Sequence, residues 1–263
     1  MVTPYMIVGC IMGMNNEMTI ANALRSLDSI ADDIVFVDGG STDGTIEIAS
    51  EFCTKILTRK WDGHHSEQRN VYLRYLIEHF LNHWAFVLDS DETLDRQSGD
   101  AIEKVIATVW TQRFWLRRKW LIGLKPSRFI ASPPHYPDWQ LRLFRISEDI
   151  SYTGQIHEAL TNRGNNSGSG RIASFVVRRS VLIRAVSIYH LDLLINSFAA
   201  RRQKVMTYER MGEGNGLPEY YLPERNLSTI DVSQDDSDLF LQDSFIQSAR
   251  PHSNYWSNVL KKS

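Results

Sequence analysis

The sequence has few cysteines, no long apolar run and almost no net charge, and each shortage excludes a class of protein. Its two cysteines, Cys10 and Cys53, show neither disulfide nor metal-binding spacing, which predicts free thiols in a reducing compartment. No stretch reaches the roughly 18 uninterrupted apolar residues that a membrane-spanning helix requires. The 29 basic and 31 acidic residues leave a net charge of -2, which argues against general nucleic-acid binding.

The chain does contain an apolar stretch near its N-terminus. Residues 5–14 have the length of a signal peptide's apolar region, but no basic residue precedes them and no small-residue cleavage site follows them. The polar run Asn15-Asn16-Glu17 ends this stretch sharply. We therefore expect a first β-strand and a cytoplasmic protein. A hydrophobic fraction of 43% predicts a substantial core.

Strands alternate with helices in the N-terminal part of the chain. Apolar runs predict strands over residues 6–14, 34–37, 55–57 and 84–89. The segments between them show the apolar spacing of amphipathic helices, at about 3.6 residues per turn. This order predicts an α/β fold with right-handed crossovers and a parallel sheet.

The remainder of the chain is less regular. We expect a helix over 98–108, then an irregular aromatic and basic segment, then strands over 140–145 and 178–188 and a helix from about 194 to 209. Beyond Gly212 the periodicity is lost and a run of aspartates appears. We predict one domain over residues 1–212, with halves 1–95 and 96–212, and a loosely structured tail over 213–263.

Three carboxylates follow the fourth predicted strand directly. Asp89, Asp91 and Glu92 come at the end of the apolar run that begins at Trp84. Ligands of open α/β sheets collect at the carboxyl ends of parallel strands. Crowded anions are costly unless a cation or hydrogen-bond donors compensate them, so we expect Mg²⁺ or Mn²⁺ there. The structural alternative is that acidic residues merely terminate the strand.

Two further motifs can carry chemistry. Asp38 ends the second strand and begins the run Asp-Gly-Gly-Ser-Thr-Asp-Gly-Thr, in which glycines permit close backbone approach and the next helix offers free amides. Its carboxylate either accepts from the N3–H of a uracil-type base or closes an Asp-Gly turn. The pair His157-Glu158 suits general-base chemistry, although such a pair is usually a structural hydrogen bond.

In this order and spacing, the motifs resemble the inverting family 2 glycosyltransferases with the nucleotide-diphospho-sugar transferase (GT-A) fold, in which a mostly parallel central sheet is flanked by helices. The resemblance covers about residues 5–210. It rests on Asn16-Glu17, Asp38 to Thr45, Gln68-Arg69-Asn70, Asp89 to Glu92, Gln140-Leu141-Arg142 and Gly154 to Glu158. The His157-Glu158 pair and the later Tyr189-His190 are most similar to bacterial enzymes that add glucose to the lipopolysaccharide inner core.

The resemblance implies roles for the matching residues. Those that would bind the donor nucleotide are Glu17, Asp38, Arg69 and Asp89. Those that would ligate the metal are Asp91 and Asp89, and His190 is either a further metal or phosphate contact or structural. Those in the acceptor-binding segment are Trp139, Gln140 and Arg142. Glu158 would be the general base, and a contribution of His157 stays open because many relatives have an acidic pair at this point. Arg201, Arg202 and Lys204 are either structural or contacts of the leaving diphosphate.

The implied activity is metal-dependent, inverting transfer of a sugar from a nucleotide-diphosphate donor, expected to be a UDP-hexose. Residues 1–95 would bind this donor, and residues 96–212 would bind a glycan or lipid-linked acceptor in lipopolysaccharide or cell-surface polysaccharide synthesis. The cations of residues 113–128 are either a solvated lid or a peripheral contact with the inner face of the cytoplasmic membrane.

Two alternatives remain from the residues alone. Asp89, Asp91 and Thr93 also fit the Asp-x-Asp-x-Thr signature of haloacid-dehalogenase-like phosphatases, in which the first Asp is a nucleophile. That signature normally opens its fold, whereas here an ordered α/β segment precedes it. The other alternative is a non-catalytic module that binds nucleotide-sugars and lacks a working base.

Overall fold

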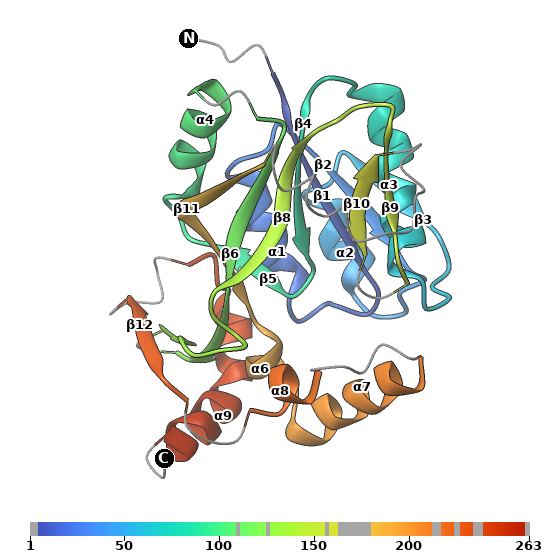
Figure 1. Cartoon of the computed structure of the whole chain (residues 1–263). Coiled ribbons are helices and arrows are strands. Elements are labelled where there is room, and N and C mark those ends of the chain that lie inside the picture. Colours follow the sequence, from blue (N-terminus) through green and yellow to red (C-terminus); the bar gives the residue numbers. More distant parts are fainter. Residues whose placement is uncertain are drawn as a thin grey trace.

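The computed structural model describes residues 5–108, 111–124, 127–155, 158–162, 180–211, 217–223, 227–233 and 239–260. Within these residues, helices flank a ten-stranded sheet whose main path runs β12-β7-β6-β8-β4-β1-β2-β3 (Figure 1). None of the helices in these ranges is long and apolar enough to cross a membrane. The α/β arrangement agrees with the sequence.

The N-terminal elements form the parallel part of the sheet, in the order β3-β2-β1-β4. Their bounds are β1 (Ile7–Gly13), β2 (Asp33–Asp38), β3 (Lys55–Thr58) and β4 (Trp84–Asp89), with α1 (Ile20–Asp28), α2 (Thr45–Ser50) and α3 (His65–His79) between them. Asp38 and Asp89 therefore both end strands at the same edge of the sheet, as the sequence predicts.

The next elements extend this sheet mainly by antiparallel pairing. β8 joins β4, and β6 joins β8, both antiparallel, whereas β11 lies parallel to β6. The elements are β5 (Glu92–Leu94), α4 (Ser98–Thr108), β6 (Arg113–Gly123), β7 (Ser127–Ile130), β8 (Asp138–Arg145), β9 (Ile150–Thr153), β10 (Ala159–Asn162), β11 (Ser180–His190), α6 (Asp192–Ile195), α7 (Phe198–Arg210), α8 (Leu217–Tyr221), β12 (Thr229–Ser233) and α9 (Asp243–Leu260). β9 and β10 form a separate hairpin.

The prediction of an irregular segment after α4 was wrong, because residues 113–123 form the long strand β6. Their cations hid the strand pattern, but the described ones have partners within the protein. Arg118 pairs with Asp138, and Arg128, on the following strand, pairs with Asp231. Arg117 donates to the Tyr136 hydroxyl at 2.7 Å. Neighbouring strands and loops thus supply hydrogen-bond or ion-pair partners for these three cations, which are therefore not simply solvated.

Apolar side chains cover both faces of the parallel strands. On β1, Ile11 packs in the layer beneath α1, whereas Cys10 packs in the layer beneath α3. Burial on both faces explains why these strands read as continuous apolar runs. Both cysteines are free, and burial raises the pKa of the Cys10 thiol well above its ordinary value and that of Cys53 to about 12.

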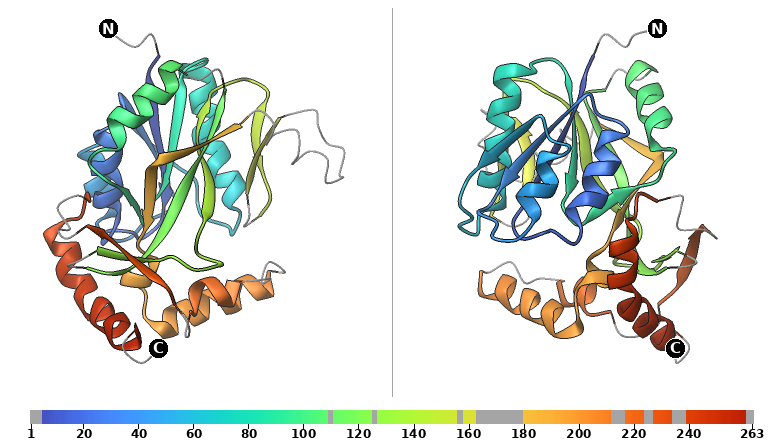
Figure 2. Two further views of the ribbon diagram at one scale, coloured as in Figure 1. Left: turned by 60° about the vertical axis from the view of Figure 1, so that its left-hand side comes forward. Right: turned by 180° about the vertical axis from the view of Figure 1, so that it is seen from behind.

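The C-terminal residues differ from the loosely structured tail that the sequence predicts. β12 pairs with β7, and α9 packs against β6 and α6. Phe245, Ala249, Ser253 and Trp256 are the buried residues of α9, spaced as one helical face. That spacing was present in the sequence, but Pro251 and the preceding polar residues obscured it. Figure 2 shows α7, α8 and α9 gathered at the end of the sheet opposite the N-terminus.

Truncation of Trp256 should show that α9 is part of the folded domain. The side chain is 1% exposed, and its indole nitrogen donates to the Leu193 carbonyl at 3.0 Å. We expect Trp256→Ala to lower the free energy of unfolding by about 3–5 kcal/mol in urea denaturation. The adjacent Tyr255 is 46% exposed, so Tyr255→Ala serves as the control. Equal unfolding midpoints for the two variants would contradict this packing.

Candidate active site

A cavity of about 950 Å³ lies at the carboxyl ends of the parallel strands. Residues at the ends of β1 and β4 line it, together with residues of α7 and α8. Figure 1 shows these two helices beyond the ends of the parallel strands. Seven of the predicted site residues line it: Arg69, Asp89, Asp91, Gln140, Arg142, Glu158 and His190. The fold therefore brings together residues that are widely separated in the sequence.

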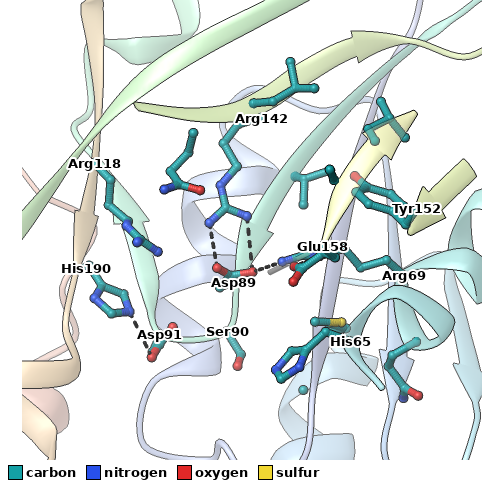
Figure 3. A pocket seen from close by; sticks show the side chains of 18 of the residues that line it. His65, Arg69, Asp89, Ser90, Asp91, Arg118, Arg142, Tyr152, Glu158 and His190 are labelled. Carbon is teal, nitrogen blue, oxygen red and sulfur yellow. Dashed lines mark hydrogen bonds and ion pairs between the residues drawn. The ribbon is translucent and has the colours of Figure 1, made fainter. Parts of the chain in front are cut away.

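Acidic and basic side chains alternate along one side of this cavity (Figure 3). Arg69 of α3 donates from Nε to Glu158 Oε1 at 2.5 Å and from Nη2 to Asp89 Oδ1 at 2.6 Å. Arg142 of β8 then donates from Nη2 to Asp89 Oδ2 at 2.6 Å and to Glu92 Oε1 at 2.7 Å. Asp89 is therefore held between two arginines.

The same alternation continues onto β6. Arg118 lies 3.6 Å from Glu92 and donates from Nε to Asp138 at 2.8 Å. Gln140 donates to the other oxygen of Asp138 at 2.7 Å. We call the complete series the ion-pair chain; its members in order are Glu158, Arg69, Asp89, Arg142, Glu92, Arg118 and Asp138.

The ion-pair chain sets the protonation of its buried members. Burial alone would raise the pKa of the Asp89 carboxyl, but Arg142 and Arg69 outweigh this effect and hold that pKa well below its ordinary value. For Glu92, which is completely buried, burial wins and the pKa is raised. Asp89 is thus an anion whose two oxygens are both engaged by arginines. The structure does not bring Asp89 into contact with His190, the predicted metal ligand that lies furthest from it in the sequence.

A second group of polar side chains lies beside the ion-pair chain. Asp91 Oδ2 is 3.3 Å from His190 Nε2, because β5 pairs with the end of β11. Lys204 of α7 lines the same cavity and lies 2.8 Å from the buried Asp192. Burial opposes ionisation of Asp91, but His190 and Lys204 favour it, and its pKa is lowered to about 2. Among the described residues, no three His, Cys, Asp or Glu side chains gather closely enough to form a metal site by themselves.

Asp38 and Glu17 do not line the cavity, in contrast to the predicted contacts with the nucleotide. Asp38 is 1% exposed, and its carboxylate accepts from the Gly40 amide at 2.8 Å and from the Ser41 amide at 3.1 Å. Glu17 accepts from the Gly44 amide at 2.9 Å. Both side chains brace the loop between β2 and α2, which is the turn interpretation of this motif. Asn16 and Gly39 line the cavity at this point instead.

The predicted acceptor segment divides between two environments. Gln140 and Arg142 line the cavity, whereas Trp139 does not. Arg142 is buried, and its terminal nitrogens are bonded to Asp89 and Glu92, so its observed contacts are internal. His157 lies outside the described residues, so only Glu158 of the predicted catalytic pair can be placed.

Sequence reasoning missed much of the wall opposite the strand ends. Tyr208 of α7 and Tyr220 and Tyr221 of α8 line the cavity, together with Trp120 of β6. The sequence places Tyr220 and Tyr221 in the loosely structured tail. Two adjacent tyrosines were the only local signal there.

Comparisons with known proteins agree with these features. Residues 10–111 match the family model described as Glycosyl transferase family 2. An uncharacterized glycosyltransferase of Rickettsia typhi is 31% identical over 94 residues, which cover 36% of this chain and 30% of that protein. The lipopolysaccharide core biosynthesis glycosyltransferase LpsC of Rhizobium meliloti is 26% identical over 175 residues, which cover 62% of this chain and 60% of LpsC. The chain thus spans less than two thirds of the length of either relative.

Among solved structures, residues 1–349 of S. aureus TarS superpose with a TM-score of 0.47 at 15% identity, covering 82% of this chain and 72% of the other. A TarS structure in complex with UDP-GlcNAc gives the same TM-score of 0.47 at 14% identity, covering 82% of this chain and 71% of the other. The resemblance drawn from the motifs is confirmed by the family match of residues 10–111, and the α/β fold implied by that resemblance is the one observed.

Proposed function

We propose that this chain transfers a sugar from a nucleoside-diphosphate donor to an acceptor hydroxyl, with inversion at the anomeric carbon. One observation carries the proposal: a carboxylate suited to accept a proton, Glu158, shares a cavity with a group suited to a diphosphate, Asp91, His190 and Lys204. The family 2 match of residues 10–111 supports the same reaction class. The name of LpsC supports an acceptor in lipopolysaccharide core synthesis, and the motif resemblance supports a UDP-hexose donor.

A divalent cation, Mg²⁺ or Mn²⁺, fits the donor set at Asp91 and His190. Neighbouring ligands of an octahedral ion at about 2.1 Å lie about 3 Å apart, and the two donor atoms here are separated by 3.3 Å. Mg²⁺ is commonly held by one or two carboxylates together with substrate phosphates, so Asp91 supplies the required carboxylate and a third protein ligand is not needed. When bound, such a cation would neutralise negative charge on the leaving diphosphate.

Lys204 is the second cation that would meet the diphosphate. It is the one of the three helix cations named from the sequence that lines the cavity. Arg201 is buried and donates to the Tyr221 carbonyl at 2.6 Å, while Arg202 is exposed on the outer face of α7. The Lys204 side chain is 29% exposed, and its ammonium group binds Asp192. An ammonium has three N–H donors, so donors remain for a phosphate oxygen.

In the proposed reaction, Glu158 accepts the proton of the acceptor hydroxyl as that oxygen attacks the anomeric carbon. The bond from this carbon to the diphosphate oxygen breaks, and the electron pair leaves with the nucleoside diphosphate. Arg69 binds Oε1 of Glu158, so Oε2 is the oxygen that we assign to the proton. Attack from the face opposite the leaving group converts an α-linked donor into a β-linked product.

The two alternatives from the sequence are less compatible with these contacts. A haloacid-dehalogenase-like phosphatase would need Asp89 as a free nucleophile, whereas both of its oxygens accept hydrogen bonds from arginines. A non-catalytic binding module would not need Glu158, which lies in the cavity with 13% of its side chain exposed.

Nucleotide-sugars should stabilise the protein in a metal-dependent way. A ligand at about 100 times its Kd adds about 2.7 kcal/mol of stability, which raises the Tm of a domain of this size by roughly 5–10 °C. We expect this shift for a UDP-hexose with Mn²⁺ in a thermal-shift screen, with a smaller shift when EDTA replaces the metal. ADP- and GDP-sugars are the matched controls for recognition of the uracil nucleobase.

The same samples, incubated without acceptor, separate the three functions. Slow release of free sugar is expected of a transferase. Release of inorganic phosphate would indicate the phosphatase, and stabilisation without any release would indicate the binding module. Either of these two results would overturn the proposed transferase.

A further inference from the structure

We infer that Arg69 is the positioning residue of the general base, and that Arg69 and Asn70 of α3, together with the His65 amide, hold the hairpin on which this base is carried. The inference rests on the proposed function of Glu158. It differs from the sequence prediction, in which Arg69 lies near the uridine of the donor.

Arg69 is fixed on several sides. It is 4% exposed, and besides Glu158 and Asp89 it contacts the Tyr72 hydroxyl, at 3.4 Å from Nη1. Its guanidinium also lies over the ring of Tyr152, 5.7 Å from the ring centre. A planar guanidinium with a fixed fork of donors can hold two carboxylates at a set separation, which an ammonium cannot do.

Glu158, by contrast, has little support from its own segment. It directly precedes β10, a strand of four residues that pairs only with β9 among the described elements. The hairpin β9–β10 is separate from the ten-stranded sheet. Among the residues that the structure describes, the ion pair with Arg69 therefore ties the Glu158 carboxylate to the body of the domain.

Helix α3 binds this hairpin region at three points along one side. The His65 amide donates to the Gln155 carbonyl at 2.8 Å. Arg69 binds Glu158, one helical turn further on. The Asn70 side chain donates to the Tyr152 carbonyl at 3.0 Å and accepts from the Tyr152 amide at 2.9 Å. The side-chain amide of Asn70 thus replaces a missing strand partner for β9, and the three contacts together align the hairpin with α3.

The position of Arg69 also connects the base to the strand-end carboxylates. Its Nη2 donates to Asp89, which is held from the other side by Arg142. Asp89 is itself the end of β4, in the centre of the sheet. One guanidinium therefore links the rigid end of β4 in the core to the carboxylate carried by the peripheral hairpin. This arrangement places the base with the accuracy that a near-attack geometry demands.

Substitution of Arg69 should consequently lower kcat and leave donor binding nearly unchanged. For Arg69→Met we expect kcat for sugar transfer to fall about 100-fold, because misplacement of a catalytic group by about 1 Å has effects of this size. The Kd of the nucleotide-sugar, measured by calorimetry, should change less than about 3-fold. Arg69→Lys should recover part of the lost kcat, since it retains the charge but not the fork. Arg74, an exposed arginine of the same helix, gives the matched control Arg74→Met.

Amide hydrogen exchange tests the anchoring without reference to activity. Peptides covering residues 150–162 should exchange faster in Arg69→Met and Asn70→Ala than in the wild type, while peptides from β1 and β4 should stay protected. Arg69→Lys, which keeps the buried charge compensated, decides the question if Arg69→Met does not fold. Unchanged exchange in the hairpin would overturn the anchoring.

The inference also fails if the donor Kd weakens in step with kcat, because Arg69 would then be a nucleotide contact. The double variant Arg69→Met/Glu158→Gln tests the role of Arg69 separately from the proposed function. If Arg69 acts through Glu158, the double variant should be no slower than Glu158→Gln alone, and additive losses would refute the inference. A wild-type protein that transfers no sugar would refute the proposed function, whereas the exchange experiment would still decide the anchoring.

Discussion

Replacement of Glu158 with glutamine should lower kcat for sugar transfer by about 10²–10⁴-fold, because the amide cannot accept the proton of the acceptor hydroxyl. The glutamine amide still offers an oxygen to Arg69, so the hydrogen bond from Arg69 Nε can be kept. The affinity for the nucleotide-sugar donor should therefore be retained. Steady-state transfer rates together with calorimetric Kd values for the nucleotide-sugar measure both effects.

Glu148→Gln is the matched control for this substitution, because Glu148 is exposed in the turn between β8 and β9. It should transfer sugar at the wild-type rate. Full activity of Glu158→Gln would remove Glu158 from the mechanism. Loss of donor binding in the same variant would mean that Glu158 holds the donor rather than the acceptor's proton.

Removal of divalent metal should abolish transfer, and Asp91→Asn or His190→Ala should reproduce much of that loss in the presence of metal. A metal ion at the diphosphate supplies several kcal/mol of transition-state stabilisation, which corresponds to about 100-fold or more in rate. Activity in EDTA, and its recovery on titration with Mn²⁺ or Mg²⁺, measures the requirement. The variants should need more metal for half-maximal rate than the wild type.

Asp100→Asn, on the exposed face of α4, is the control for a nonspecific effect of charge. Asp89→Asn makes a sharper comparison. Because Asp89 is bound by Arg69 and Arg142, its neutralisation should lower the free energy of unfolding and leave the metal concentration for half-maximal rate nearly unchanged. Undiminished transfer in EDTA would contradict the cation site, and a raised metal requirement in Asp89→Asn would return Asp89 to the ligand set.

The parallel half of the fold could be predicted because its signals are local. The apolar run of β4, for example, is uninterrupted from Trp84 to Leu88 and stops at Asp89, and β1 and β2 end in the same abrupt way. Strands buried on both faces must be apolar at every position. For this part of the chain, element type and order follow directly from composition over short windows.

The second half could not be predicted to the same extent, because its strands carry charges that are compensated from a distance. From the sequence, Arg118 in β6 is predicted to be a surface residue. In the structure, Asp138 and Glu92 lie beside it and compensate its charge. The helix α9 was obscured for a related reason. Its apolar face makes sense only when β6 and α6 are present to cover Trp256.

The sequence by itself determined that carboxylates would stand at the ends of parallel strands, and its family resemblance predicted that Glu158 and His190 share a site with Asp91; all three line one cavity. Only the tertiary structure decided how these carboxylates are used. Arg142 reaches Asp89 across 53 positions of sequence, and Arg69 reaches Glu158 across 89. Such contacts depend on strand register and on the docking of a hairpin against α3, and the energy of an ion pair depends on burial, which no local pattern encodes. Asp89 and Asp91 are two residues apart, yet the fold pairs one with arginines and presents the other to His190.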